Sequence, residues 1–220
     1  MILLAIDTAG ADCAAAVYDS GRGIVLAEQT ETIGKGHAER LMSLIDAVMA
    51  EAGLKLAAVE RVAVVIGPGS FTGIRVGVAA ARGLALALGV KAVGVSTLAV
   101  IAAEALERRG DADDRPVIAV MDAKRDELYL QAFASSGAVL SPPTVASMEE
   151  AKDLAAAYPG AELAGSGSCL LSQSADPGGA DRFPIRLVAR LGVSSTDQPK
   201  PLYLRGPDVR PQEGFAVARI

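Results

Sequence analysis

The chain has 220 residues, of which 51% are apolar and 21% are charged, and its net charge is −5 with a pI near 5.0. This composition predicts a soluble protein with a well-packed core, and it argues against stand-alone binding of tRNA or DNA, which needs a basic surface. The chain lacks Trp and has four Tyr and four Phe, too few aromatic side chains to favour a platform that stacks single-stranded bases.

The first half of the chain begins with three short apolar runs that are typical of buried strands. They are ILLAID at 2–7, CAAAVYDSG at 13–21 and GIVLAEQTE at 23–31, and the Gly-Arg-Gly turn between the last two predicts a hairpin. HAERLMSLIDAVMAEAG at 37–53 then shows helical spacing, with its last glycine as the stop. Its apolar stripe comprises Leu41, Leu44, Ile45, Val48, Met49 and Ala52.

A glycine-rich turn follows the next predicted strand, and it resembles a phosphate-binding loop at first sight. VERVAVVIGPGS at 59–70 predicts a strand that runs into a structural loop, with Ser70 capping the helix after it. The spacing fits neither G-x-x-x-x-G-K-[ST] nor G-x-G-x-x-G, because Thr72 occupies the third glycine position of the latter and the nearest downstream lysine is Lys91. The pattern favours a tight strand-to-helix turn over an anion site. The loop residues are Gly67, Pro68, Gly69 and Ser70.

The helix predicted after this loop, FTGIRVGVAAARGLALALG at 71–89, is apolar nearly all round. From Ile74 to Leu88 its only charges are Arg75 and Arg82, and Gly89 is the expected stop. A helix that is apolar on two sides must be covered on two sides. We expect one cover to be its own sheet and the other to be the first helix, a second copy of the chain or a different protein, and we favour a helix-bundle interface.

The second half of the chain repeats the pattern of the first. PVIAVMDAKRDELYLQAFASSGAVLSPPTV at 116–145 predicts three strands, and SMEEAKDLAAAYPG at 147–160 predicts a helix with a capping box. Asp7 and Asp122 each end the first strand of their half. We interpret this as a duplication that forms two lobes meeting in a cleft, an N-terminal lobe at 1–105 and a C-terminal lobe at 106–220, joined by a polar connector. A chance recurrence of the same elements is the alternative.

Features along the chain also indicate its compartment. Cys13 and Cys169 are far apart, without the spacing of metal ligands, and we expect inert thiols in a reducing environment. The N-terminal MILLAIDTAG has no basic region and is not typical of a signal peptide. The longest apolar stretch, 76–90, is interrupted by Arg82 and is too short and too charged to favour a membrane span. These features predict a cytoplasmic protein without membrane contact.

Five strings in order along nearly the whole chain resemble the TsaB (YeaZ) family, namely LAIDTA, GPGSFTGIRVGVAAARGLA, GVSTL, MDAKRDELYLQAF and PLYLR. These bacterial proteins take part in making threonylcarbamoyladenosine in tRNA, and the GPGSFTGIR string is highly specific to them. The resemblance implies an α/β, actin-like and sugar-kinase-like (ASKHA) fold of two ribonuclease-H-like lobes, in agreement with the duplication.

The resemblance also implies partners. They are TsaD, the catalytic paralogue, in a heterodimer; TsaE, an ATPase that acts through the TsaB–TsaD complex; and a second copy of this chain in a homodimer. It further implies that tRNA is met only through the complex, and that the first two helices make the contacts. The expected interface residues are His37, Leu41, Leu44, Ile45, Val48, Thr72, Gly73, Val76, Gly77, Ala80 and Leu84. Glu in place of Gly77 or Ala80 is expected to disrupt both dimers.

Catalytic residues of the paralogue have no counterpart in this sequence. TsaD carries a His-x-x-x-His metal pair after a strand, and the corresponding positions here are Thr97 and Ile101, while His37 is the sole histidine of the chain. The resemblance thus predicts a subunit with no catalytic residue and no metal or cofactor of its own, and leaves ATP or ADP and a metal to the complex with TsaD and TsaE. We expect His37 to cap the first helix or to pack at the interface.

A weaker resemblance concerns nucleotide binding. Asp7 and Thr8 resemble the first phosphate loop of actin-like ATPases, with Asp122 as the carboxylate of the second lobe, but Ala9 stands where those loops have glycine. LAGSGSCLL at 163–171 is either a degenerate adenine-side loop or a plain glycine turn, and the latter is favoured.

Two further features lie toward the C-terminus. Arg205 is either an anchoring ion pair or a partner contact, and the two readings stay open. The segment after Pro199 is expected to be extended, because it is rich in proline.

The sequence therefore supports one principal function and one alternative. The first is a non-catalytic scaffold that binds and activates TsaD for transfer of the threonylcarbamoyl group to N6 of the adenosine next to the anticodon, in tRNAs that read ANN codons. The alternative is a self-sufficient nucleotide-dependent enzyme of the actin and sugar-kinase superfamily. A free-standing tRNA binder fits the acidic composition least well.

Overall fold

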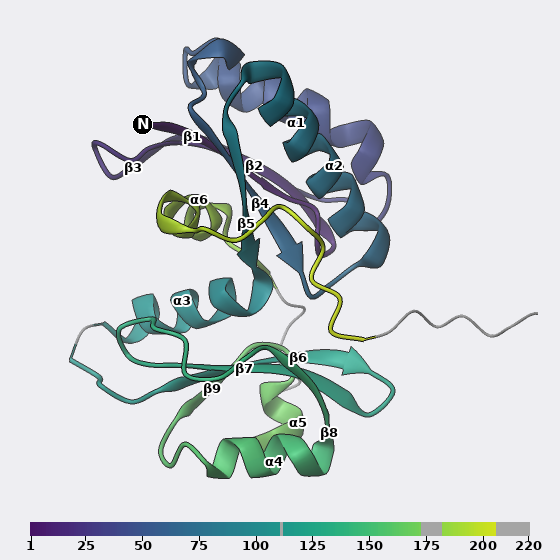
Figure 1. Ribbon diagram of the computed structural model, residues 1–220, viewed down its shortest axis with the longest axis vertical. Helices are drawn as coiled ribbons and strands as arrows, with labels where there is room; N and C mark the ends of the chain where they lie inside the picture. Colours follow the sequence, from purple (N-terminus) through teal and green to yellow (C-terminus); the bar gives the residue numbers. More distant parts are fainter. Residues whose placement is uncertain (111, 173–181, 206–220) are drawn as a thin grey trace, which may run out of the picture.

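Two β-sheets with their helices are stacked along the long axis of the molecule (Figure 1). The structure is a computed structural model, and it describes residues 1–110, 112–172 and 182–205. The first sheet has the order β3-β2-β1-β4-β5. Its strands are β1 (Ile2–Asp7), β2 (Asp12–Asp19), β3 (Ile24–Thr32), β4 (Arg61–Gly67) and β5 (Lys91–Ser96). β1 and β3 are both antiparallel to β2, and β4 and β5 run parallel to β1.

Two helices, α1 (His37–Glu51) and α2 (Phe71–Leu88), lie side by side over one face of this sheet (Figure 1), and a short 3-10 turn, η1 (Leu56–Ala58), precedes β4. The predicted helix signals are confirmed. The Ser70 hydroxyl accepts a hydrogen bond from Gly73 N at 3.2 Å, and Gly89 ends α2 with a left-handed φ of 68°.

The second sheet repeats the first, with the order β8-β7-β6-β9. Its strands are β6 (Val117–Lys124), β7 (Glu127–Phe133), β8 (Thr144–Ser147) and β9 (Glu162–Ala164), and its outer helices are α4 (Met148–Ala156) and α5 (Ser168–Ser172). In each sheet the first three strands are antiparallel neighbours and the fourth is parallel to the first. The capping box between Ser147 and Glu150 is present at the start of α4. The predicted duplication and the two-lobed α/β fold are confirmed.

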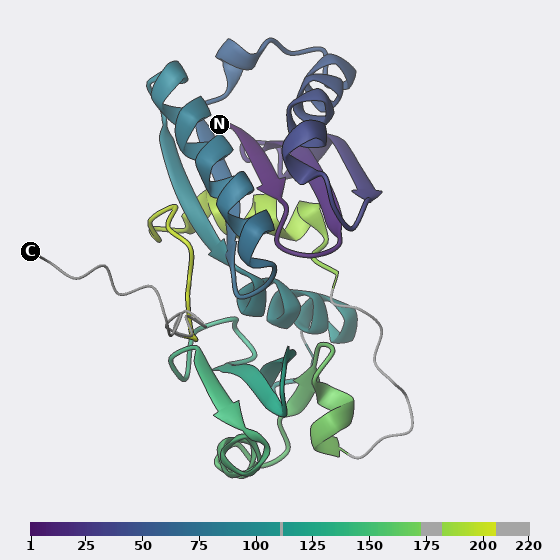
Figure 2. The same cartoon turned by 90° about the vertical axis from the view of Figure 1, so that its right-hand side faces the viewer.

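Two further helices cross between the lobes. The helix α3 (Thr97–Arg109) follows β5 in the chain but packs against β6 and β7, whereas α6 (Ile185–Ser194) comes from the second half and packs against β1 and β2. Figures 1 and 2 show the resulting layers, in which α6 and α3 separate the two sheets. The predicted boundary between residues 105 and 106 assigns all later residues to the second lobe. The packing instead places α6, which comes from the second half of the chain, on the first lobe.

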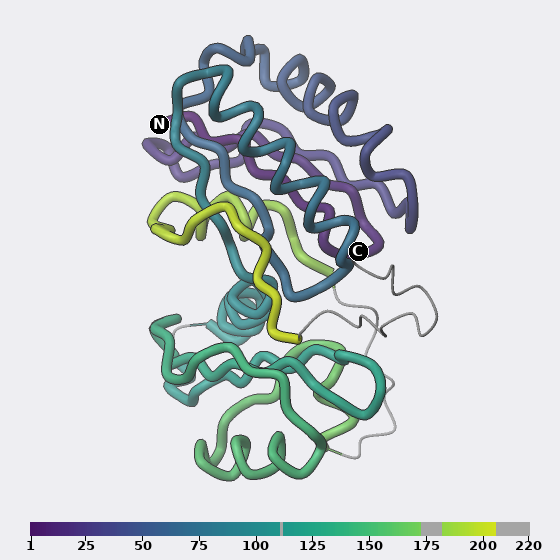
Figure 3. The backbone as a smooth tube through the Cα atoms, turned by 45° about the vertical axis from the view of Figure 1, so that its right-hand side comes forward, coloured from purple at the N-terminus to yellow at the C-terminus, as the bar shows by residue number. Residues whose placement is uncertain are grey.

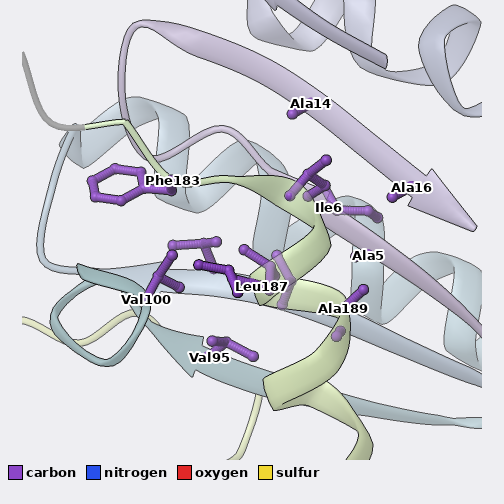
Figure 4. Close-up of a cluster of buried hydrophobic side chains, with 14 of the residues drawn as sticks. Ala5, Ile6, Ala14, Ala16, Val95, Val100, Phe183, Leu187 and Ala189 are labelled. Atoms are coloured by element: carbon purple, nitrogen blue, oxygen red, sulfur yellow. The ribbon is translucent and has the colours of Figure 1, made fainter. Parts of the chain in front are cut away.

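The principal core lies where α6 meets the first sheet. Leu187, Val188 and Ala189 are fully buried there, and Figure 4 shows Leu187 among side chains of β1, β5 and α3. A Cβ on Gly192 would lie 2.4 Å from Ala63 Cβ, so glycine allows α6 to approach β4 closely. Each fully buried Leu stabilises the fold by about 1.5–3 kcal/mol. The two lobes therefore share apolar packing, rather than being joined by a connector alone.

Candidate docking face and glycine loop

The glycine loop between β4 and α2 packs against the turn that follows β1. Ser70 N donates to Ala9 O at 2.7 Å, and the Thr8 hydroxyl donates to Gly73 O at 2.7 Å. A Cβ on Gly69 would lie 2.5 Å from Ala9 O, and a Cβ on Gly73 would lie 1.9 Å from Thr8 O. The glycines therefore allow backbone to touch backbone, which supports the tight-turn reading rather than an anion site.

The first residues of the loop are held from other sides. Gly67 has a φ of 98°, in the region that favours glycine, and the Gly67–Pro68 peptide bond is cis. The Thr97 hydroxyl donates to Pro68 O at 2.7 Å. Thr97, which the family resemblance led us to compare with a metal-binding histidine, is thus a buried structural residue at the start of α3.

Asp7 and Thr8, the predicted nucleotide-proximal pair, are both buried, with 1% of each exposed. Burial is the main cause that raises the pKa of Asp7 to about 7, and the charge of Asp12 raises it further, although the backbone N–H groups of Thr8 and Ala9 oppose the change. Asp7 Oδ1 accepts from Ala9 N at 2.8 Å. The carboxyl group is therefore occupied inside the lobe rather than presented to a hydrated metal ion.

Asp122, its counterpart in the second lobe, has different surroundings. It is half-buried, accepts from Lys124 N at 2.7 Å and pairs with Lys124 Nζ at 2.6 Å. Burial favours a higher pKa for Asp122, but the hydrogen bonds and charge of Lys124 outweigh it and the pKa is lowered. Asp7 is the last residue of β1, whereas β6 continues for two residues beyond Asp122, and the two aspartates do not form an equivalent pair of ligands.

The second-lobe turn at 165–167 repeats the packing of the first glycine loop. Gly165 has a φ of 103°, and a Cβ there would lie 2.4 Å from Val120 O. Gly167 N donates to Val120 O at 3.0 Å, and the Ser166 hydroxyl accepts from Asp122 N at 3.0 Å. These contacts support a plain glycine turn over an adenine-side loop.

The apolar stripe of α1 faces its own sheet. Leu41, Leu44, Ile45 and Val48 are at most 1% exposed, and α1 packs against β2 and β3. His37 is also buried, and its Nε2 lies 3.2 Å from Asp12 O. The prediction that these five residues form a partner interface is therefore wrong, because the stripe is the surface that any helix buries against its sheet.

Part of the α2 prediction is wrong for the same reason. Gly73, Gly77 and Leu84 are buried. A Cβ on Gly77 would lie 2.5 Å from Thr8 Oγ1 and 3.3 Å from Val64 Cγ2, so Glu at this position would disturb the fold of the monomer rather than report on a dimer. Of the predicted α2 residues, Thr72 is exposed and Val76 and Ala80 are half-buried.

A different set of residues covers the outer side of these helices. Leu86 is 85% exposed, Phe71 52% and Met42 of α1 46%. Along α2 the outward positions recur every three or four residues, a spacing that could have been found by removing the sheet-facing stripe from the pattern. We call this surface the docking face. It comprises Met42, Phe71, Thr72, Arg75, Val76, Ala79, Ala80, Arg82, Gly83 and Leu86.

The length and composition of α2 would suffice for a membrane-crossing helix, with a mean hydropathy of 1.4 over its 18 residues. Its inner side, however, packs against β4 and β5 as a core helix does. The apolar outer side is therefore the feature that sequence and packing leave unexplained within one copy of the chain.

The remaining candidate residues are explained by packing and ion pairing within the fold. Cys13 is buried in β2, and burial, with the nearby charge of Asp7, raises the pKa of its thiol to about 11, as expected for an inert thiol. Arg205 forms an ion pair with Glu127 and donates to Lys124 O at 3.3 Å, which supports the anchoring alternative. Ile101 is buried in α3. Within the described residues, no group of three or more His, Cys, Asp or Glu is placed to hold a metal ion.

The sequence of the chain is similar to a known family model and to several known proteins. Residues 24–173 match the family model described as "TsaD: tRNA N6-adenosine threonylcarbamoyltransferase". An uncharacterized protein of Mycobacterium tuberculosis is 33% identical over 95% of this chain and 94% of its own length. The tRNA threonylcarbamoyladenosine biosynthesis protein TsaB of Escherichia coli is 34% identical over 59% of this chain and 53% of its own length.

A solved structure agrees over a longer range. YeaZ from Pseudomonas aeruginosa is 28% identical, covers 92% of this chain and 99% of its own, and superposes with a TM-score of 0.75. The fold, the glycine loop and these relatives lead to the same conclusion, that the chain belongs to the TsaB (YeaZ) family.

Proposed function

We propose that this chain is a non-catalytic accessory subunit in the formation of threonylcarbamoyladenosine in tRNA. It binds TsaD, the catalytic paralogue, and activates it for transfer of the threonylcarbamoyl group to N6 of the adenosine next to the anticodon, in tRNAs that read ANN codons. The names of its relatives and the matching family model support the pathway. The observation that carries the subunit role is the docking face, an exposed apolar surface on helices whose inner sides are already packed.

The surroundings of Asp7 and of the glycine loop favour an accessory role for this chain over a catalytic one. Asp7 is buried with a raised pKa, and the glycine loop is filled by the backbone of Thr8 and Ala9. These residues do not fit a hydrated magnesium ion and a bound phosphate, so we assign no step through a metal or nucleotide to this chain. ATP or ADP and a metal belong, in this proposal, to the complex with TsaD and TsaE.

Activation then follows from differential binding. If the chain binds the active conformation of TsaD more tightly than the inactive one, complex formation raises the population of the active form. Burial of one Leu or Phe side chain at such a contact contributes about 1.5–3 kcal/mol. Leu86 and Phe71 are therefore the expected anchors, since both are large and apolar, with 85% of Leu86 and 52% of Phe71 exposed.

The remaining partners follow from the same surface and from the charge of the chain. A second copy of the chain is expected to use the docking face when TsaD is absent, which gives a homodimer in competition with the heterodimer. TsaE joins through the TsaB–TsaD complex. Because the chain has a net charge of −5, tRNA is bound in this proposal by the complex, in the cytoplasm, and not by this chain alone.

Replacement of Leu86 by Glu tests the proposal. The variant should bind purified TsaD at least about 30-fold more weakly in calorimetry, because an anchor worth about 2 kcal/mol is lost and a charge is placed in the contact. Its melting temperature should stay unchanged, since the side chain is 85% exposed. Leu140→Glu is the matched control, an exposed leucine in the second lobe that should leave TsaD binding unaltered. Equal TsaD affinity of wild type and Leu86→Glu would refute the docking face.

The alternative, a self-sufficient nucleotide-dependent enzyme, makes a separate prediction. It requires the isolated chain to bind ATP–Mg²⁺ and Asp7→Ala to abolish that binding. The burial of Asp7 argues against it. Calorimetric titration of ATP–Mg²⁺ into the isolated chain separates the two functions, because micromolar binding with turnover is compatible with the alternative alone.

A further inference from the structure

The segment that follows α6 runs from one lobe to the other, as Figure 3 shows for its yellow course past the first lobe. We call residues 195–205 the strap. Its first part is hydrogen-bonded to β5 and β4 of the first sheet. The Ser195 hydroxyl donates to Gly94 O at 2.7 Å, Gly94 N donates to Asp197 O at 2.9 Å, and Leu202 N donates to Ile66 O at 2.8 Å.

The middle of the strap contacts the first turns of α2. Arg75 Nε donates to the Tyr203 hydroxyl at 2.8 Å. The guanidinium carbon of Arg75 lies 3.5 Å from the centroid of the Phe71 ring and 5.6 Å from that of Tyr203. A guanidinium over an aromatic face is an attractive contact at an exposed site. Phe71 and Arg75 are members of the docking face, so the strap reaches that surface.

The end of the strap holds the β6–β7 turn of the second lobe. Arg205 pairs with Glu127 and donates to Lys124 O at 3.3 Å. This turn is unusual, because Lys124, Arg125 and Asp126 have positive φ angles of 63°, 59° and 59°. Residues other than glycine rarely adopt this region, and they persist there when surrounding contacts determine the conformation. Arg205 supplies two such contacts, and Asp122 supplies another through Lys124 N.

We propose that the strap couples the first turns of α2 to the β6–β7 turn, so that the contact between Arg75 and Tyr203 helps to maintain the left-handed conformation of a turn in the other lobe. Arg75 and Lys124 belong to different lobes, and Tyr203 and Arg205 are two residues apart in one extended segment that touches both. A partner that covers Phe71 and Arg75 would then act on the second lobe through Tyr203. This last extension rests on the proposed function, whereas the coupling itself does not.

Hydrogen exchange of the full chain, without any partner, tests the coupling. Tyr203→Phe keeps the ring and removes the hydroxyl that accepts from Arg75. Because a hydrogen bond contributes about 0.5–1.5 kcal/mol net, amide exchange in peptides that cover the β6–β7 turn should become about 2- to 12-fold faster. Tyr158→Phe is the matched control, since it removes a hydroxyl that donates to Leu140 O at 3.3 Å elsewhere in the second lobe, and it should leave exchange in the turn unchanged.

A second variant makes the test independent of one substitution. Arg205→Gln should accelerate exchange in the turn directly, and adding Tyr203→Phe to it should give no further acceleration there, because the link to the first lobe is already cut. Unchanged exchange in the turn of Tyr203→Phe would overturn the proposal, as would additive effects in the double variant. Because TsaD is absent from the experiment, either result is separate from the fate of the docking face.

Discussion

Asp7 carries a buried carboxyl group, and its replacement by Asn should stabilise the protein at alkaline pH. The pKa is 3.8 in the reference state and about 7 in the folded chain. At pH values below 3.8 the group is protonated in both states and costs nothing. Between the two pKa values the unfolded chain loses the proton while the folded chain keeps it, so stability falls as pH rises, and above about 7 the loss is complete.

The size of the effect follows from the difference of about 3 between the two pKa values. At about 1.4 kcal/mol for each pH unit, ionisation of Asp7 lowers the free energy of unfolding by roughly 4 kcal/mol at pH 8.5 and by less than half of that at pH 5. Asn has no such cost, and its side-chain oxygen can still accept from Ala9 N as Asp7 Oδ1 does. The gain of Asp7→Asn over wild type should therefore be about 2 to 3 kcal/mol larger at pH 8.5 than at pH 5.

Urea denaturation of both proteins at the two pH values measures this difference. Asp153→Asn, an exposed carboxylate on α4, is the matched control and should change the free energy of unfolding by no more than about 0.5 kcal/mol at either pH. A gain of Asp7→Asn that is the same at pH 5 and pH 8.5 would refute the reasoning, because it would mean that the carboxyl does not change its charge between them.

Other predictions follow from packing. Gly73→Ala should lower the free energy of unfolding by about 3 kcal/mol or more, because its Cβ would lie 1.9 Å from a backbone oxygen, whereas Gly83→Ala, with nothing within 4 Å, should raise it by about 0.5–1 kcal/mol. Leu44→Ala should cost about 2–5 kcal/mol in urea denaturation, while Met42→Ala should leave stability near wild type and weaken TsaD binding in calorimetry. The Cys13 thiol should react with a thiol reagent at pH 8 only after unfolding, and modification of the native protein at the unfolded rate would contradict its burial.

Local signals in the sequence predicted the elements well. Ser70, Gly89 and the capping box at Ser147 form hydrogen bonds with residues three or four positions away. Both partners of each interaction can therefore be identified from the local sequence. The repeated strand pattern likewise predicted a duplication, and the structure has two sheets whose first four strands follow the same order. The predicted hairpin between β2 and β3 and the glycine turn at 165–167 agree with the structure for the same reason. Predictions that fall on residues from 206 onward lie outside the described part of the chain.

Long-range packing could not be obtained in this way. The stripe of Leu41, Leu44 and Val48 predicts that one side of α1 is covered, but its period is the same whether the cover is a sheet or a partner. The exchange of α6 onto the first lobe depends on contacts between residues more than a hundred positions apart, such as Arg61 Nη1 with Val193 O at 2.7 Å. The apolar stripe and the residue spacing do not indicate which distant segment packs against a given helix.

The glycine loop and the docking face are linked by one physical constraint. Gly69 and Gly73 let the start of α2 touch the turn after β1, and Gly77 lets its second turn touch Thr8, so the inner side of the helix is fixed by contacts that no Cβ would permit. A loop bound to Thr8 and Ala9 in this way has little room for a phosphate, but it fixes the rotation of α2 about its axis. That rotation determines which side chains face outward, and it places Phe71, Arg75 and Leu86 there. The feature that resembles a nucleotide loop is therefore better explained as the structure that fixes the orientation of α2.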